Sequence, residues 1–217
     1  ASFEWAFQEF ETMFSDSRNS KPETLFSLMP ELNNKMDQPF SGDELNSLMC
    51  IMFMASFETT KDTLGSILVE LMKRPALFEY ILHAGEKEIN VLVEELLRIA
   101  TPLQYTMRIC KEDMEIDGHF FSKGTRLYVC LASANRDEAV FENPDEIVAD
   151  RKDNPQLAFG GGVHSCIGAR VARQEIRAWL KPLSRLLINY TIAGNETPQW
   201  QHTIFMRGLR QLNVVHK

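Results

Sequence analysis

Hydrophobic residues recur at three- and four-residue steps through the first hundred residues, which is the spacing of one helix face. Short polar or proline-containing breaks interrupt this pattern. It predicts helices over residues 3–15, 24–32, 43–73, 75–82 and 86–99. Ser41-Gly-Asp-Glu44 has the composition of a cap for the longest helix. Lys73-Arg74-Pro75 suits its end, because cations favour the negative pole of a helix and proline cannot extend it.

The pattern changes after Pro102. Short, partly β-branched segments between Asp-Gly and Lys-Gly turns predict strands at residues 105–110, 114–116 and 125–128. A long irregular stretch then runs over residues 135–162. It is followed by a helix over 169–187, in which Pro182 predicts a kink or an early stop, and by weak strands at 190–193 and 212–215. We therefore expect a mainly α fold with small β-sheets, as a single domain over residues 1–217.

The composition is that of a globular protein, with 217 residues of which 44% are hydrophobic and 24% charged. The formal net charge of −7 argues against a dedicated nucleic-acid binder, because such proteins neutralise phosphates. The four cysteines are far apart and form no zinc-type pair, which favours reduced thiols and a cytoplasmic location. The most apolar run, residues 48–57, is too short for a bilayer, so no membrane span is expected.

The strongest chemical signal is the glycine-rich segment from Phe159 to Gly168, directly before the helix predicted from residue 169. Its consecutive glycines, Gly160 and Gly162 among them, free the backbone for positive φ and for close approach to a flat partner. A thiolate of Cys166 would be favoured by the helix dipole and is a soft ligand suited to iron. The alternatives are a buried, inert cysteine and a phosphate-binding loop, and the second lacks the Gly-Lys-Ser/Thr ending.

Phe159, Gly162, Cys166 and Gly168 match the FxxGxxxCxG loop of the cytochrome P-450 haem-thiolate monooxygenases, so the chain resembles that family. His164 stands where many members carry arginine or histidine. The resemblance implies haem b (iron protoporphyrin IX) as the cofactor, with Cys166 as the thiolate ligand of its iron. It also implies that the glycines of this loop lie at the cofactor and that the Gly168 amide tunes the sulfur.

A second segment, Ala55-Ser-Phe-Glu-Thr-Thr60 in the longest predicted helix, resembles the oxygen-activating (A/G)Gx(D/E)T(T/S) motif of the same family. The Thr59 hydroxyl can bond the carbonyl of Ala55 one turn back, which would open a bend beside the haem. The resemblance implies that Ala55 lies at the cofactor, and that Glu58 and Thr59 supply a carboxylate and a hydroxyl for proton delivery. The alternative is a stripe of small residues that allows close helix packing. Ser56 stands where the family usually has glycine.

Glu95-Leu-Leu-Arg98 matches the ExxR motif of the family, whose Glu–Arg pair binds an arginine from a later irregular stretch. Arg151 is the match here, which implies a structural network of Glu95, Arg98 and Arg151. A solvated Glu–Arg pair on one helix face is the alternative. Ala134-Asn-Arg-Asp137 resembles a stretch of soluble bacterial members, and Arg108 stands where members place a ligand of a haem propionate.

This resemblance implies a monooxygenase that inserts one oxygen atom from dioxygen into a small apolar substrate. His164 and Arg108 would neutralise the haem propionates. Electrons would come from a ferredoxin or a flavoprotein reductase, docked on a basic patch of Arg170, Arg173 and Arg177. The alternative for these arginines is a solvated helix face.

Members of the family are longer, and this chain corresponds to their C-terminal half. It is therefore a fragment, a subunit that pairs with a second chain or with the N-terminal half, or a native short form that oligomerises. The start at Ala1, without an initiator methionine and almost at once inside a predicted helix, favours the first. The long and final helices are expected to expose apolar flanks. The second functional hypothesis is a non-catalytic helper or interaction protein derived from the family.

Overall fold

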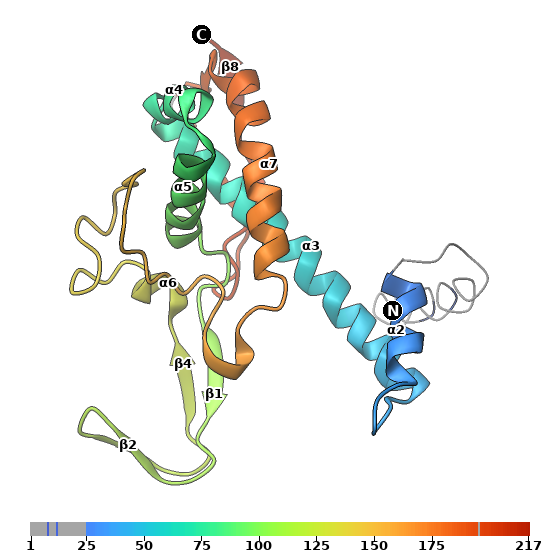
Figure 1. Cartoon of the computed structure of the whole chain (residues 1–217). Coiled ribbons are helices and arrows are strands. Elements are labelled where there is room, and N and C mark those ends of the chain that lie inside the picture. The colour runs from blue at the N-terminus through green and yellow to red at the C-terminus, as the bar shows by residue number, and fades with distance from the viewer. Residues whose placement is uncertain (1–7, 9–11, 13–24, 195) are drawn as a thin grey trace. The chain divides into compact units, whose positions relative to one another are not determined.

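The computed structural model describes Gln8, Thr12, residues 25–194 and residues 196–217 (Figure 1). The helix predicted over residues 3–15 therefore lies outside the described residues, apart from Gln8 and Thr12, which are helical. By its internal contacts the chain divides into two compact units, residues 1–58 and 59–217. The division falls within one long helix, α3 (Gly42–Lys73).

The described part of the first unit consists of α2 (Leu25–Asn33) and the first half of α3. Asn33 closes the turn between them, because its side chain both donates to and accepts from the Phe40 backbone at 2.8 Å. Helix α3 then begins at a capping box: the Glu44 carboxylate accepts from the Ser41 N–H at 2.8 Å, and the Glu44 N–H donates to the Ser41 hydroxyl at 3.3 Å. The cap predicted for the longest helix is confirmed.

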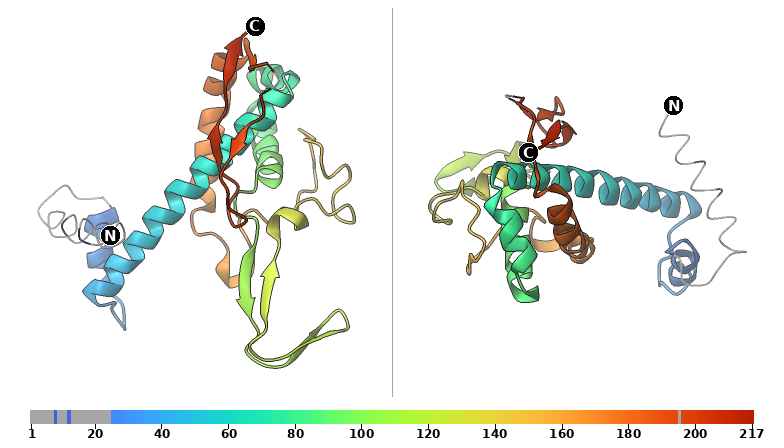
Figure 2. Two further views of the ribbon diagram at one scale, coloured as in Figure 1. Left: turned by 180° about the vertical axis from the view of Figure 1, so that it is seen from behind. Right: turned by 90° about the horizontal axis from the view of Figure 1, so that it is seen from above.

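The second unit is built around the rest of α3 and the helices α4 (Ala76–His83), α5 (Glu86–Ile99), α6 (Leu131–Ala134) and α7 (Ala169–Leu187). Helices α4 and α5 both pack against α7 (Figures 1 and 2). The buried side chains of α5 follow the helical period at Ile89, Leu92, Val93 and Leu96. Since burying one leucine contributes roughly 2 kcal/mol, this apolar face accounts for how α5 is held against the core.

The strands of the described residues pair in antiparallel two-stranded sheets: β1 (Thr106–Ile109) with β4 (Arg126–Val129), β2 (Met114–Ile116) with β3 (His119–Phe121), β5 (Tyr190–Ile192) with β8 (Val214–His216), and β6 (Gln199–Trp200) with β7 (Leu209–Gln211). Asp117 and Gly118 turn the β2–β3 hairpin with φ of 49° and 77°, as an Asp-Gly turn requires. This hairpin extends beyond the end of β1 and β4 (Figure 1).

The mainly α fold with small β-sheets is confirmed, and most predicted elements end within one or two residues of their observed bounds. Strands β3, β6 and β7 and helix α6 were not predicted, because segments of two to four residues carry too little periodicity. The early stop at Pro182 is wrong, since α7 continues to Leu187. Leu180 and Leu187 are buried on either side of the proline, and this packing supports the last turns of the helix.

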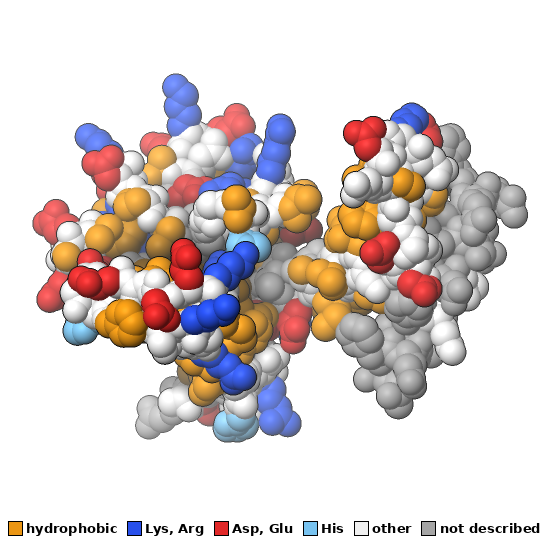
Figure 3. Space-filling model, turned by 90° about the horizontal axis from the view of Figure 1, so that it is seen from below, with side chains coloured by type: hydrophobic (Ala, Val, Ile, Leu, Met, Phe, Trp, Pro, Cys, Tyr) orange, Lys and Arg blue, Asp and Glu red, His pale blue; other side chains and the backbone are white. Residues whose placement is uncertain are grey.

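Large hydrophobic side chains are exposed in both units, as predicted for the flanks of α3 and α7 (Figure 3). In the first unit, Phe53 and Phe57 of α3 are 57% and 63% exposed. In the second, Val163 and Ile167 near Cys166 are 97% and 94% exposed, and α7 exposes Val171. Within the part of the chain that the structure describes, the helices are all too short or too polar to cross a membrane.

Candidate functional site

The loop that carries Cys166 begins at Phe159 and leads directly into α7. Gly160 and Gly162 adopt φ of 66° and 65°, a backbone region that residues with a Cβ rarely enter. The loop is closed by the Cys166 N–H, which donates to the Phe159 carbonyl at 2.9 Å. The Cys166 thiol is free and exposed, so the alternative of a buried cysteine is wrong. The structure therefore presents a soft sulfur donor at the surface of the second unit.

Glu95 and Arg98 form an ion pair on α5 in which both side chains are fully buried. Arg98 Nε and Nη2 donate to the two carboxylate oxygens, each at 2.8 Å. Arg151 Nε donates to Glu95 Oε2 at 2.9 Å, so the structure brings together the three residues of the predicted network. The alternative of a solvated pair is wrong. The aromatic ring of Phe141 covers the network, with Arg98 Cζ 4.9 Å from its centroid.

The remaining donors of Arg98 reach main-chain carbonyls of the long irregular stretch. Nη1 donates to Asn135 at 2.8 Å and to Pro144 at 2.6 Å, and Nη2 donates to Glu146 at 2.8 Å. An arginine that donates to carbonyls at residue 135 and at residues 144 and 146 fixes the relative position of these two parts of the stretch. This explains how a stretch with little regular structure has a defined path before it enters the cysteine loop.

Burial raises the pKa of the Glu95 carboxyl, but hydrogen bonds from Arg98, the Val148 N–H and Arg151 outweigh burial. The pKa therefore lies below the ordinary value of 4.5, and the carboxylate stays ionised inside the protein. Asn154 adds a further bond to Glu95 Oε2 at 3.2 Å. No local sequence pattern marks this asparagine, because it is 59 residues away from Glu95.

Asn135 is a second buried residue that sequence reasoning did not single out. Its side chain donates to Thr101 Oγ1 at 2.6 Å and accepts from the Leu157 N–H at 2.7 Å. It thereby links the end of α5 to the chain just before the cysteine loop. The available signal was its place in Ala134-Asn-Arg-Asp137, the segment that carried part of the family resemblance.

On α3, Ala55 and Glu58 are exposed and Thr59 is half-buried. The Thr63 hydroxyl donates to the Thr59 carbonyl at 2.8 Å, so a threonine does bond a carbonyl one turn back in this helix. The Ser56 hydroxyl likewise donates to the Phe53 carbonyl at 3.0 Å. The bond from the Thr59 hydroxyl to Ala55 and the bend stay predictions.

The two residues assigned to the propionates are both exposed in the second unit. Arg108 lies on β1, where Nη1 donates to Thr106 Oγ1 at 2.8 Å and to the Met107 carbonyl at 2.9 Å. His164 ends the short 3-10 helix Gly162–His164 in the cysteine loop. Their side chains are therefore accessible to an anionic group, and their assignment stays a prediction.

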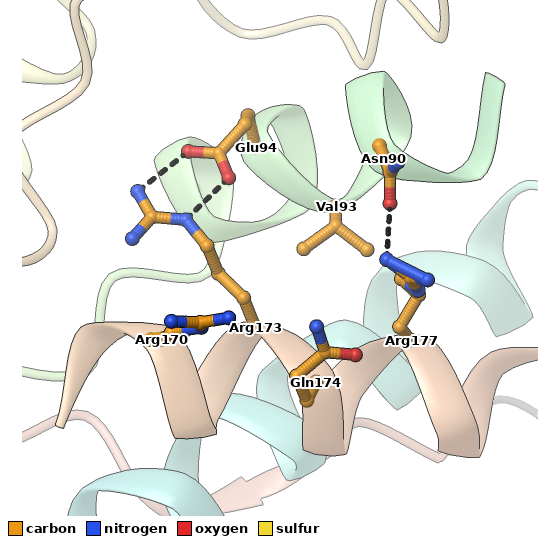
Figure 4. A pocket seen from close by; sticks show the side chains of 7 residues that line it. All are labelled: Asn90, Val93, Glu94, Arg170, Arg173, Gln174 and Arg177. Atoms are coloured by element: carbon orange, nitrogen blue, oxygen red, sulfur yellow. Dashed lines mark hydrogen bonds and ion pairs between the residues drawn. The ribbon is translucent and has the colours of Figure 1, made fainter. Parts of the chain in front are cut away.

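A shallow pocket of about 220 Å³ lies between α5 and α7 (Figure 4). It is lined by Asn90, Val93, Glu94, Arg170, Arg173, Gln174 and Arg177. Arg173 is paired with Glu94 by two bonds, of 2.6 and 2.9 Å. Arg177 donates to Glu86 at 2.8 Å and to Asn90 at 2.9 Å. The expected patch of three arginines is therefore corrected: acidic or amide partners engage two of them, and Arg170 is the exposed one.

The chemistry of the loop fits the haem that the resemblance implies. The donor is an exposed thiol, which is the ligand class that haem-thiolate sites use. Val163 and Ile167, close to Cys166 in the sequence, have almost fully exposed apolar side chains. Exposed apolar side chains of this kind are suited to contact with an apolar macrocycle. A Cβ at Gly168 would lie 3.9 Å from Cys166 Sγ, which places this glycine next to the sulfur.

Comparison with known proteins agrees with this geometry. Residues 3–84 and 89–208 match the sequence model of the family described as cytochrome P-450. Among curated proteins, YjiB of Bacillus subtilis is 33% identical over 80% of this chain and 43% of its own length. The polyketide biosynthesis cytochrome P-450 PksS of Bacillus subtilis is 34% identical over 80% of this chain and 43% of its own.

Among solved structures, P450BioI in complex with an acyl carrier protein ligated to hexadec-9Z-enoic acid superposes with a TM-score of 0.87. It is 27% identical, and the match covers 98% of this chain and 54% of that one. This chain thus spans about half the length of the curated relatives and solved structures that it matches. The fold of this chain therefore corresponds to about half of the solved structure.

Proposed function

The chain belongs to the cytochrome P-450 family, and we propose that it is the haem-bearing part of a monooxygenase that inserts one oxygen atom from dioxygen into a small apolar substrate. The observation that carries this proposal is the exposed Cys166 thiol on a loop shaped by positive-φ glycines at the start of α7. The family supports the oxidoreductase class, and the loop supports a role for this chain in holding the cofactor.

In this proposal Cys166 would be the thiolate ligand of haem b, and the apolar Val163, Ile167 and Phe159 would help to hold it. The glycines of the loop let its backbone approach a flat group closely. Arg108 and His164 neutralise the propionates from exposed positions. When bound, haem b supplies the oxidising chemistry, and the thiolate donates electron density to its iron.

Ala55, Glu58 and Thr59 are proposed to serve oxygen activation from α3. A carboxylate and a hydroxyl at adjacent positions of one helix can hold and pass on a proton. The exposed Glu58 takes a proton from solvent, and Thr59 passes it onward through its hydroxyl. The small side chain of Ala55 leaves room on the helix surface. The segment thus combines the Glu58 carboxylate, which is exposed to water, with the Thr59 hydroxyl, which can pass on a proton.

The proposed electron donor is a ferredoxin or a flavoprotein reductase, and the proposed location is the cytoplasm. The face of α7 around the pocket supports docking by an acidic donor only in part, because Glu86 and Glu94 neutralise Arg177 and Arg173. Arg170 is the exposed cation there. An apolar substrate is supported by two relatives, one named for polyketide biosynthesis and one solved with an acyl carrier protein that carries hexadec-9Z-enoic acid.

A non-catalytic helper or interaction protein is the second candidate. The observation that favours it is the exposure of Phe53, Phe57 and Val171 in a chain that spans about half of its relatives. Such side chains are suited to binding another polypeptide. This candidate needs no haem, and that difference separates the two.

Haem titration of the purified chain, followed by reduction under carbon monoxide, tests the proposal. We expect the strongly red-shifted Soret band that a thiolate-ligated haem gives, and its loss in Cys166→Ala. Cys130→Ala is the matched control, because Cys130 is also a free, exposed cysteine. A chain that takes up no haem, or a red-shifted band that persists in Cys166→Ala, would contradict the proposal. The first of these results would support the helper.

A further inference from the structure

Glu94 holds the guanidinium of Arg173 in one orientation across the α5–α7 interface (Figure 4). Arg173 Nε donates to Oε1 at 2.6 Å and Nη2 donates to Oε2 at 2.9 Å. Gln156 donates to the same carboxylate at 3.0 Å. Burial raises the pKa of Glu94, but these hydrogen bonds outweigh burial and the pKa lies below 4.5. The pair is therefore ionised, and its parallel bonds leave Arg173 little freedom to rotate.

The same guanidinium contacts both ends of the cysteine loop. Its Cζ lies 4.6 Å from the centroid of the Phe159 ring, in a cation–π contact. Its Nη1 donates to the Ala169 carbonyl at 3.4 Å. Phe159 in turn accepts the N–H of Cys166 through its carbonyl at 2.9 Å. Arg173 thus touches the residue that begins the loop and the residue that follows it, with Cys166 between them.

The pKa of Arg173 is raised, chiefly by the hydrogen bonds to Glu94 and against the effect of burial, so its guanidinium stays charged. Arg177, one turn further along α7, donates instead to Glu86 and Asn90. Of these two cations on α7, Arg173 is the one with contacts to the cysteine loop.

We propose that Arg173, held by Glu94, is a positioning residue for Cys166: it clamps the cysteine loop through Phe159 and Ala169. This inference rests on the proposed function only in identifying Cys166 as the haem ligand. The clamp itself belongs to the protein without haem. It links the Glu94–Arg173 salt bridge, which lines the pocket between α5 and α7, to the loop that holds the Cys166 sulfur.

Two measurements on the haem-free chain test the clamp. The first is hydrogen–deuterium exchange of the peptide that spans residues 159–168, which reports how well the loop is held. The second is the rate of Cys166 alkylation at neutral pH, relative to the exposed Cys130 in the same sample, which reports how the loop presents the sulfur to the reagent. Arg173→Gln removes both the charge and the clamp. Arg173→Lys keeps the charge but loses the fork to Glu94.

We expect Arg173→Gln to speed exchange of the loop by roughly three- to tenfold, since the cation–π contact and three hydrogen bonds are lost. It should also raise the rate of Cys166 alkylation by about twofold, because a looser loop opens the sulfur to the reagent more often. Arg173→Lys should raise both rates by less, because it keeps a cation on α7 but loses the fork to Glu94. Arg177→Gln, the matched control, should change neither quantity.

Unchanged exchange in both Arg173 variants, or an equal change in Arg177→Gln, would overturn the proposal. If Arg173→Gln does not fold, Glu94→Gln and Arg173→Lys decide, because each weakens the fork without removing the cation. Neither readout involves haem. A chain that binds no haem but shows the expected exchange and alkylation rates would therefore contradict the proposed function alone. A chain that binds haem through Cys166 but lacks the expected changes in these rates would contradict the clamp alone.

Discussion

The Asp62 carboxylate lies directly against the backbone of Gly208: a Cβ at Gly208 would stand 2.6 Å from Asp62 Oδ1. Asp62 is fully buried on α3, and Gly208 directly precedes β7. One turn along α3, a Cβ at Gly65 would stand 2.9 Å from the Leu209 Cβ. The β6–β7 hairpin therefore packs closely against α3 at two glycines, Gly65 on the helix and Gly208 on the hairpin.

Gly208→Ala should destabilise the chain by about 1–3 kcal/mol, because the added methyl cannot fit without displacing the hairpin or the buried carboxylate. Urea denaturation followed by circular dichroism measures the free energy of unfolding. Gly42→Ala is the control, since nothing lies within 4 Å of a Cβ at that position. Equal stability of Gly208→Ala and the unchanged chain would contradict the close approach.

Arg98→Ala should destabilise the chain by about 3–5 kcal/mol, because it leaves the buried Glu95 carboxylate with fewer partners and removes donors from three carbonyls. The same denaturation experiment measures the effect. Lys73→Ala removes an exposed pair with Glu70 and should change stability by no more than about 1 kcal/mol. A small loss in Arg98→Ala would mean that the network is solvated rather than buried.

Stability should fall as the pH falls below the ordinary glutamate value of 4.5. The pKa values of Glu70, Glu94 and Glu95 are lowered in the folded chain despite burial, because hydrogen bonds from basic partners hold the charged form. A carboxyl whose pKa is lower in the folded chain than in the unfolded chain adds to the free energy of unfolding at any pH above its unfolded pKa. This contribution is lost as the pH falls through the pKa of the folded state. Melting temperatures at a series of pH values check this.

Glu94→Gln should weaken that acid dependence, since one of these partly buried carboxyls with a lowered pKa is then absent. Stability that stayed constant or rose on acidification below pH 4.5 would show that these carboxylates are not held ionised in the folded chain.

Gly162→Ala should lower haem uptake and destabilise the chain by roughly 1–2 kcal/mol, because a residue with a Cβ is strained at φ of 65°. Gly161→Ala is a close control: its φ is −160°, and nothing lies within 4 Å of a Cβ there. Absorbance titration with haem and urea denaturation measure the two effects. Equal behaviour of the two variants would mean that the loop adopts another backbone path.

The bounds of α5 and α7 agree with the sequence prediction because a strong apolar period and clear breaks at both ends define them. The pairing of Glu95 with Arg98 follows from their spacing on one helix, whereas Arg151 was placed with them only by family resemblance. The Glu94–Arg173 pair joins residues 79 positions apart, and no local pattern marks it. Contacts that depend on how helices pack are not readable from periodicity alone.

The electron paramagnetic resonance spectrum of the ferric, haem-loaded chain tests the role of Cys166 most directly, because axial thiolate ligation gives a low-spin signal with a characteristically narrow spread of g values. We expect this signal in the unchanged chain and in Cys130→Ala, and its disappearance in Cys166→Ser. A thiolate signal that survives in Cys166→Ser, or one that never forms in the loaded chain, would contradict the assignment of this sulfur as the iron ligand.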